Sequence, residues 1–454
     1  MSVLLSDEQR EIRDLARRFA AEEIAPRAGE WDRERHFPRR LFPALGELGL
    51  MGVCVPVEHG GAGADFLSYA LVLEELSRAD AGVGVTVAVH TSVGTLPLLA
   101  HGSAEQVGRL VPPLAQGHGL GAIALTEPGA GSDLRAIRTA WRDGGLHGAK
   151  QWITNGAHAD LILVLAREAD GHSAFLVRGG APGLAVTGEA EKLGLHSSNT
   201  ADLSFDATPA ERLGPAGGGL RIALGAMDGG RIGIAAQAVG IAQAALDCAV
   251  AHARERRAFG EPIGARGQIQ RKLADMQTEV EAARAMTHRA ARLKDAGRPH
   301  SVEGAQAKLF ASGVARRQTG EAIQVLGGYG YMTDFPAERY YRDAKVTEIY
   351  EGTSEIQRLV IARALLGEAG RRPRAPAARR PNDRRRRRGR GRGAPRDRRG
   401  CAWHRSSRSS ERGCAARDRA RLSRRPCAET RRGPIPPRAR SARRSRPIGR
   451  PGAP

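Results

Sequence analysis

The residue in this sequence best placed to do chemistry is Glu351, within the segment from Tyr341 to Leu366. It stands between an aromatic side chain, Tyr350, and the tight turn that Gly352 allows. A carboxylate beside an apolar side chain has its charged form destabilised by desolvation, so it can serve as a general base. Structural carboxylates far outnumber catalytic ones, and the local context alone favours an ordinary surface glutamate before a turn.

A glycine-rich stretch, LTEPGAGSD, runs from Leu125 to Asp133 and could contact a ligand. Gly129 and Gly131 lack a Cβ and let the backbone approach a ligand closely. Thr126 and Ser132 offer hydroxyl groups as donors or acceptors. A plain glycine-rich turn explains the same pattern equally well.

A second stretch, KQWITNGA from Lys150 to Ala157, combines an apolar plane with a donor. Trp152 supplies the indole and Thr154 the hydroxyl group. The alternative is a strand that packs one face in the core.

Two charged patterns follow in the second half of the chain. Asp228 and Arg231 are three residues apart, so on a helix they share one face, where they form either an intrahelical ion pair or part of a ligand site. Arg256 and Phe259 precede a glycine turn, and the guanidinium fork suits a diphosphate. A solvated run of arginines is the alternative for this second pattern.

Metal and Rossmann chemistry have little support in the sequence. The 13 histidines are scattered, without an HExxH motif or a histidine pair flanked by carboxylates. No GxGxxG follows a strand pattern and opens a helix. We therefore expect no metal site and no Rossmann dinucleotide site.

Net charge divides the 454-residue chain in two. Residues 371–454 contain 31 arginines, no lysine and 5 acidic residues, a net charge of +26. The whole chain carries +22, so residues 1–370 carry −4, as an ordinary, mildly acidic globular protein does.

The arginine-rich extension allows two interpretations. Its low complexity cannot bury a core, so we expect disorder. It is either an arm that binds nucleic acid or another acidic surface, or the product of a frameshift or readthrough in GC-rich DNA. The second interpretation is favoured, because arginine alone, beside proline, glycine and alanine, is what a wrong reading frame gives.

Cysteine usage and the first residues indicate a cytoplasmic protein. Only Cys54 and Cys248 lie outside the extension, which indicates no disulfide framework and favours a reducing compartment. The acidic residues among the first thirty fit neither a signal peptide nor a transit peptide. The longest nearly uncharged apolar run, Ala81 to Val93, is too short for a membrane span and predicts a core helix.

The periodicity predicts an α+β protein that is helical over 1–120, forms a small β-sheet or barrel over 121–215, is an antiparallel helical bundle over 216–370, and ends in the disordered extension 371–454. Ser6 and Gln9, and later Ser103 and Gln106, have the spacing of capping boxes. Another helix is expected to start near Pro38.

Over residues 1–370 the chain resembles the acyl-CoA dehydrogenases, flavoenzymes that desaturate acyl thioesters. The resemblance rests on six motifs in order: LTEPGAGSD, KQWITNGA, MDGGRIGIAAQAVGIAQAAL, RERRAFG, AIQVLGGYGY and IYEGTSEIQR. It implies a short-chain, medium-chain or branched-chain enzyme of fatty acid β-oxidation, because the glutamate lies in YEGT.

The resemblance also assigns roles to residues. Glu351 would be the catalytic base. The implied FAD-binding residues are Leu125, Thr126, Gly131, Ser132, Trp152, Ile153, Thr154, Arg256, Phe259, Gln324, Val325, Leu326, Gly327, Gly328, Thr353 and Glu355. The implied acyl-CoA-binding residues are Ser132, Asp228, Arg231 and Gly352.

The implied reaction removes the α proton with Glu351 while the β hydride passes to flavin N5, which yields the trans-2-enoyl-CoA. Donors at the thioester oxygen, by resemblance the Glu351 N–H and a flavin ribityl hydroxyl, would stabilise the enolate. Electrons would pass to an electron-transferring flavoprotein. An oxidase of the same fold, and a basic nucleic-acid-associated scaffold, are the alternatives.

In the family the flavin site is completed by a neighbouring subunit, so the resemblance implies a homotetramer or homodimer. Ala258, Arg266 and Gly267 depart from the family pattern, which puts the adenine end of the flavin site in doubt. Acyl chain length cannot be predicted from the sequence.

Overall fold

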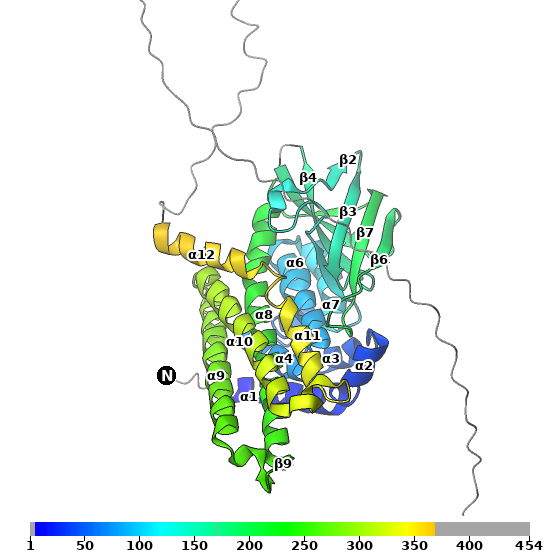
Figure 1. The fold of residues 1–454 in the computed structure, drawn as a ribbon. Helices are drawn as coiled ribbons and strands as arrows, with labels where there is room; N and C mark the ends of the chain where they lie inside the picture. The colour runs from blue at the N-terminus through cyan, green and yellow to red at the C-terminus, as the bar shows by residue number, and fades with distance from the viewer. Residues whose placement is uncertain (1–4, 170, 368–454) are drawn as a thin grey trace, which may run out of the picture. The chain divides into compact units, whose positions relative to one another are not determined.

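The structure, a computed structural model, describes residues 5–169 and 171–367 (Figure 1). The predictions for the arginine-rich extension therefore concern residues outside the described part of the chain. In order, the first helices are α1 (Asp7–Phe19), α2 (Ala28–Glu34), α3 (Leu41–Glu47), α4 (Phe66–Ala79), α5 (Ala81–Val89), α6 (Leu96–His101) and α7 (Ala104–Ala115). Wider π-helical turns, Ala20–Ile24 and His90–Thr95, follow α1 and α5.

Side chains cap the helix starts where the sequence predicts. Both capping boxes are confirmed, because Ser6 exchanges hydrogen bonds with Gln9 and Ser103 does so with Gln106. The expected start near Pro38 is three residues early, since α3 begins at Leu41. No helix was expected over α2, which has no side-chain cap and is too short to show a clear period.

The middle of the chain forms an eight-stranded sheet. Its strands are β1 (Gly121–Ala124), β2 (Ala140–Arg142), β3 (Gly145–Thr154), β4 (Leu161–Glu168), β5 (Gly171–Arg178), β6 (Leu184–Glu189), β7 (Thr200–Thr208) and β8 (Glu211–Leu213). The order is β6-β7-β3-β2-β4-β5-β8, and β1 pairs in parallel with β4. Alternating apolar residues such as Leu203 and Phe205 fill its core.

The last part is a helical bundle built from α8 (Gly219–Glu255), α9 (Gly267–Asp295), α10 (Ser301–Leu326), α11 (Ala337–Val346) and α12 (Ser354–Leu366). A small hairpin of β9 (Arg257–Ala258) and β10 (Glu261–Pro262) joins α8 to α9. With 37 residues, α8 is about 55 Å long.

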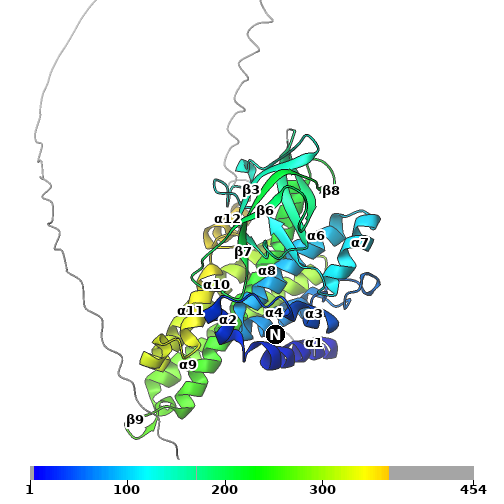
Figure 2. The same ribbon diagram turned by 90° about the vertical axis from the view of Figure 1, so that its right-hand side faces the viewer.

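The two helical regions share one apolar core. Val83 and Val85 of α5 pack in the same cluster as Ile232 of α8 and Val314 of α10. Figures 1 and 2 show the sheet at one end of the long helices and the β9 hairpin at the other end. The α+β prediction of helical, β and helical regions is confirmed for the described residues.

Two helical segments are long and apolar enough to cross a membrane, Ala81–His101 and Gly219–Glu255. The first is longer than the predicted run, because the π-helical turn continues α5 into α6. Within the protein, 83% and 72% of their most apolar windows are buried. Burial of that extent identifies both as core helices of a folded protein.

Candidate active site around Glu351

Glu351 lies on the short loop between α11 and α12. Its backbone is left-handed, with φ 51°, and that of Gly352 is too, with φ 86°. Gln357, on the first turns of α12, donates through Nε2 to the carbonyl oxygens of Glu351 at 3.3 Å and Gly352 at 2.7 Å. A non-glycine residue with this φ is uncommon, and such conformations cluster at functional sites.

The Glu351 carboxylate points into the protein. Its Oε2 atom is inaccessible to solvent and has no hydrogen-bond partner among the described residues. A Cβ on Gly230 of α8 would lie 2.5 Å from this oxygen, so a side chain there would force the carboxylate to move. Burial raises the pKa of Glu351 to about 7, and the positive charges of Lys308 and Arg231 partly oppose that shift.

Two tyrosines, Tyr350 and Tyr69, lie close enough to Glu351 to interact with its charge. The Tyr350 hydroxyl contacts Oε1 of Gln237, and burial raises its pKa above the usual range. Tyr69 of α4 is fully buried and donates to the carbonyl oxygen of Ala88 at 3.0 Å. Sequence reasoning found Tyr350 through the motif, but Tyr69 carries no local signal within its amphipathic helix.

The predicted substrate-binding pair, Asp228 and Arg231, lies on α8 near Glu351. Arg231, 6% exposed, donates through Nη1 to Asp228 Oδ1 at 2.6 Å and to Ser301 Oγ at 3.2 Å. The intrahelical ion pair is therefore present. The Nε of Arg231 is buried without a partner among the described residues, which leaves a donor for a ligand.

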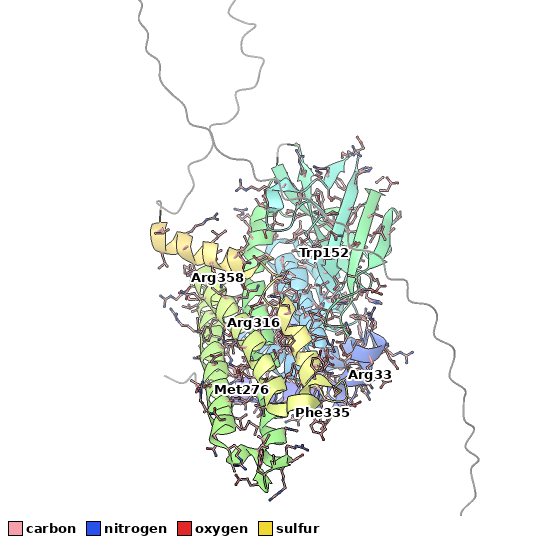
Figure 3. The ribbon with its side chains drawn as sticks, viewed as in Figure 1. Arg33, Trp152, Met276, Arg316, Phe335 and Arg358 are labelled. Atoms are coloured by element: carbon pink, nitrogen blue, oxygen red, sulfur yellow. The ribbon has the colours of Figure 1, made fainter. Side chains whose placement is uncertain are left out.

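A bulge in the sheet turns Trp152 outward. The pairing of β3 with β7 shifts register between Lys150 and Ile153, and Trp152 within that shift has φ 58°. Its backbone N–H donates to Asp202 Oδ1 at 2.9 Å, which holds the bulge. The indole is 62% exposed, and Figure 3 shows it where the sheet meets the helices. A bulge re-aims a side chain in this way.

The glycine-rich stretch is joined to this bulge through the backbone. The N–H of Gln151 donates to the carbonyl oxygen of Thr126 at 2.9 Å. Lys150, fully buried, donates to the carbonyl oxygen of Leu125 at 3.0 Å and to Glu127 Oε1 at 2.9 Å. These contacts fix the two predicted flavin segments side by side.

The predicted flavin residues in these segments differ in exposure. Gly131 and Ser132 are exposed, and Thr126 and Thr154 are half-buried. The side chains of Leu125 and Ile153 lie in apolar cores, so only their backbone is open to a ligand. Thr353 caps α12, and Glu355 is exposed beside it on a groove of about 740 Å³.

A second group of predicted flavin residues lies at the hairpin end of the bundle. Arg256 places its guanidinium 5.2 Å from the ring centre of Tyr329, and Phe259 is 94% exposed. With residues 325–328 and other neighbours, Arg256 lines a cavity of about 450 Å³. Val325 and Leu326 are buried by their side chains, whereas Gln324, Gly327 and Gly328 are exposed.

The two groups do not meet within one chain. Figure 3 shows Trp152 at the sheet end of the bundle and Phe335 near the opposite end. Phe335 belongs to the second group, because its ring packs 5.2 Å from that of Tyr329. The long helix α8, about 55 Å from end to end, runs from the sheet end toward the hairpin end.

The positions that depart from the family pattern lie around the hairpin. Ala258 lies in β9, and Arg266 pairs with Glu261 at 3.1 Å while its guanidinium stacks 5.3 Å from the Phe259 ring centre. Gly267, the first residue of α9, would meet nothing within 4 Å if it carried a Cβ. The departures thus leave the hairpin ordered and cationic.

These residues fit a flavin at the sheet end. An exposed indole plane, two half-buried threonine hydroxyls and a glycine-rich backbone surround one surface, and a buried carboxylate lies on the neighbouring loop. Among the described residues no cluster of three or more metal-ligating side chains occurs. The arrangement suits proton abstraction beside a planar redox cofactor.

Comparison with family models accounts for nearly all of the described chain. The acyl-CoA dehydrogenase N-terminal domain matches residues 6–118, the middle domain residues 122–208 and the C-terminal domain residues 217–366. The short-chain specific acyl-CoA dehydrogenase of Mus musculus mitochondria is 49% identical over 377 residues, which are 80% of this chain and 92% of that protein.

Solved structures are similarly close. A chain of the electron transferring flavoprotein structure from Acidaminococcus fermentans gives a TM-score of 0.80 and 43% identity over 81% of this chain and 100% of that chain. Butyryl-CoA dehydrogenase of Megasphaera elsdenii gives 0.79 and 40% over 81% and 100%. An acyl-CoA dehydrogenase of Bacillus anthracis with FAD gives 0.76 and 34% over 80% and 68%.

Proposed function

The chain belongs to the acyl-CoA dehydrogenase family, and from this premise we propose that it desaturates short, straight-chain acyl-CoA thioesters with Glu351 as its general base. It is a FAD-dependent oxidoreductase, like the structurally similar enzyme that contains FAD. The observation that carries the proposed role of Glu351 is its solvent-inaccessible oxygen, which lies against Gly230 without a hydrogen-bond partner among the described residues.

Glu351 would take the α proton of the thioester. An α proton is a very weak acid, so the base needs a high proton affinity and the developing enolate needs donors. Burial gives Glu351 a pKa of about 7, close to working pH, so the deprotonated form is available and still basic. Glu351 has a left-handed backbone, and its N–H would donate to the thioester oxygen.

FAD, when bound, accepts the β hydride as the α proton leaves. Trp152 would cover one face of the ring system, and the hydroxyls of Thr126 and Thr154 would bind its polar edge. The hydrogen bond from the Trp152 N–H to Asp202 holds the bulge and fixes the direction of the indole before the cofactor binds. This reduces the entropy cost of binding.

Arg231 and Asp228 would bind the coenzyme A portion near the base. The free Nε of Arg231 supplies one donor, and Ser301, which also donates to Asp228 at 2.9 Å, keeps the pair in place. Ser132, exposed on the glycine-rich loop, and Gly352 would contact the thioester part.

The proposed substrate class follows from the named relatives. The mouse relative is called short-chain specific, and the Megasphaera structure is a butyryl-CoA dehydrogenase. Because identity to both is high over nearly their whole length, a four-carbon acyl group is the first substrate to test.

An electron-transferring flavoprotein is the proposed electron acceptor. A structure described by the name of such a flavoprotein contains a chain 43% identical to this one. An oxidase of the same fold remains the alternative and would form peroxide. The nucleic-acid scaffold hypothesis rests entirely on residues outside the described part of the chain.

A homo-oligomer would complete the flavin site. The second group of predicted flavin residues lies at the hairpin end of the bundle, far from Trp152 of the same chain. Its members are Arg256, Phe259 and residues 324–328. A second copy would bring these residues to the flavin. We place this enzyme in the cytoplasm, on the strength of its bacterial relatives and of Cys54 and Cys248, the two cysteines of the described residues, which are free.

The visible spectrum of the purified protein tests the proposal. Anaerobic addition of butyryl-CoA is expected to bleach the flavin band, with weaker bleaching by octanoyl-CoA and isobutyryl-CoA. In Glu351→Gln, bleaching is expected to slow by roughly 10²–10⁴-fold. A flavin-containing protein that none of the thioesters reduces would refute the proposal, and stoichiometric peroxide in air would favour the oxidase.

A further inference from the structure

Lys308 is a fully buried lysine beside the loop that carries Glu351. It lies on α10, and its Nζ donates a hydrogen bond of 2.5 Å to the carbonyl oxygen of Gly352. Burying an ammonium group costs free energy unless hydrogen bonds or charges compensate. Sequence reasoning missed it, because it stands within a helical segment predicted only as part of the antiparallel bundle.

The Gly352 carbonyl is held from two helices. Lys308 approaches it from α10, and Gln357 from α12 at 2.7 Å. The peptide they hold follows Glu351, and both Glu351 and Gly352 have a left-handed backbone. A strained pair of this kind persists only where the surroundings fix it, so the two donors determine where the Glu351 side chain points.

Four groups with charge or titratable protons face Glu351. Arg231 comes from α8, Lys308 from α10 and Tyr69 from α4, while Tyr350 precedes it on its own loop. Arg231 is already neutralised by Asp228 at 2.6 Å. Among the described residues, no carboxylate lies within salt-bridge distance of Lys308, although the charges of Glu351, Glu348 and Glu355 act on it from farther away.

We propose that Lys308 is the positioning residue of the general base. It fixes the direction of Glu351 through the Gly352 carbonyl, and its positive charge keeps the buried carboxylate ionised and ready to accept a proton. This inference rests on the proposed function, since it gives Lys308 a part in that reaction. The burial that raises the pKa of Glu351 also lowers that of Lys308, to about 8.

The test is the pH dependence of kcat/KM with butyryl-CoA. Lys308→Gln keeps a donor for Gly352 but removes the charge, so the acid limb is expected at higher pH, with roughly tenfold lower kcat/KM near pH 6. Above about pH 8 wild type also loses the charge, and the two profiles are expected to converge. Lys308→Met removes donor and charge and is expected to be slower at every pH.

Lys345→Met is the matched control. Lys345 is half exposed on α11 and pairs with Glu348, so its loss removes a cation close in sequence to the loop without touching Gly352. Its acid limb is expected to match wild type. A limb that moves as far in Lys345→Met as in Lys308→Gln would overturn the proposal.

A second measurement needs no flavin or turnover. A ¹³C-carboxyl NMR titration of the apoprotein identifies Glu351 by the resonance lost in Glu351→Gln, and its midpoint is expected to rise in Lys308→Gln. An unchanged midpoint overturns the proposal. If the glutamine variant does not fold, Lys308→Arg replaces it, and a wild-type midpoint there supports the charge role whereas a raised midpoint refutes it.

Different results would contradict the proposed function and the proposed role of Lys308. If wild-type protein with bound flavin is not reduced by any of the thioesters, the proposed function is wrong. If wild type turns over and Lys308→Gln keeps its acid limb, the proposed function stands and the role of Lys308 is wrong.

Discussion

At the scale of single residues, Glu351 shows how the candidate active site reduces the stability of the fold. Burial raises its pKa from 4.5 to about 7, so the folded protein holds this proton more tightly than the unfolded chain does. Stability therefore falls as pH rises from about 4.5 to about 7, and the loss is complete above that range. A neutral side chain of the same shape avoids it.

Glu351→Gln is accordingly expected to be more stable than wild type at pH 8, by about 1–3 kcal/mol. At about pH 4 both side chains are neutral, and the difference is expected to vanish. Urea unfolding of the apoproteins at the two pH values measures this. An equal gain at both would show that packing, rather than charge burial, sets the difference.

Gly230 is the residue whose missing side chain makes room for the base. Gly230→Ala would place a Cβ 2.5 Å from Glu351 Oε2, so the carboxylate must move. We expect roughly 100-fold lower kcat, since small misplacements of a reacting group cost about that much. Single-turnover flavin reduction measures the effect directly.

Gly225→Ala is the control on the same helix. A Cβ at Gly225 meets nothing within 4 Å, so this change is expected to leave kcat unaltered and to stabilise α8 by up to about 1 kcal/mol. If both alanine variants lose activity equally, contact with Glu351 is not the cause.

At the scale of elements, the loop that follows β1 and the strand β3 are joined by a buried ion pair. Lys150 and Glu127 are both nearly inaccessible, and Glu127 also accepts the backbone N–H groups of Arg138 and Thr139 at 2.6 and 2.9 Å. Charge pairing keeps the pKa of Glu127 below its usual value, although burial alone would raise it.

Lys150→Met leaves Glu127 buried and unpaired, so we expect a loss of about 3–5 kcal/mol in the free energy of unfolding. Lys150→Met with Glu127→Gln should recover part of that loss, because no buried charge remains. Denaturant unfolding of the two variants measures the difference. A double variant no more stable than the single one would mean that Lys150 acts through the Leu125 carbonyl alone.

Elements whose signals are local in the sequence were predicted well. Side-chain caps at Ser6, Asp65 and Ser103 mark helix starts, and the three long helices follow the apolar period. The α2 helix gave no such signal. The bulge at Trp152 depends on Asp202, a partner fifty residues away, so no local pattern could reveal it.

The candidate active site was predicted only in part, because some of its residues have local sequence signals and others depend on distant partners. Glu351, Asp228 and Arg231 lie in motifs and were proposed from the resemblance, and the structure brings Arg231, paired with Asp228, close to Glu351. Tyr69 and Lys308 approach Glu351 from helices that pack there only in the folded protein. Their positions depend on tertiary contacts, which the spacing of residues along one helix does not encode.

At the scale of the whole molecule, the division of the flavin residues between the two ends of the bundle predicts complementation between subunits. Glu351→Gln damages the sheet end and Arg256→Ala the hairpin end. In a hybrid of the two variants, one shared site carries both defects and another carries none. An isolated hybrid dimer is therefore expected to show roughly half of wild-type turnover, and an unselected random mixture roughly a quarter.

Co-expression with two different affinity tags isolates the hybrids for this measurement. Each variant alone is the control, and both are expected to be impaired, Arg256→Ala mainly in flavin affinity. Hybrids no more active than the better parent would mean that each subunit builds its whole site.

If the flavin is held between two copies, as proposed, flavin binding and subunit association form one linked equilibrium. Each flavin that binds would then tighten the contact between copies, and each contact would tighten flavin binding by the same factor. Dilution of the protein would then release bound flavin. A shortage of riboflavin would first increase the fraction of dissociated subunits.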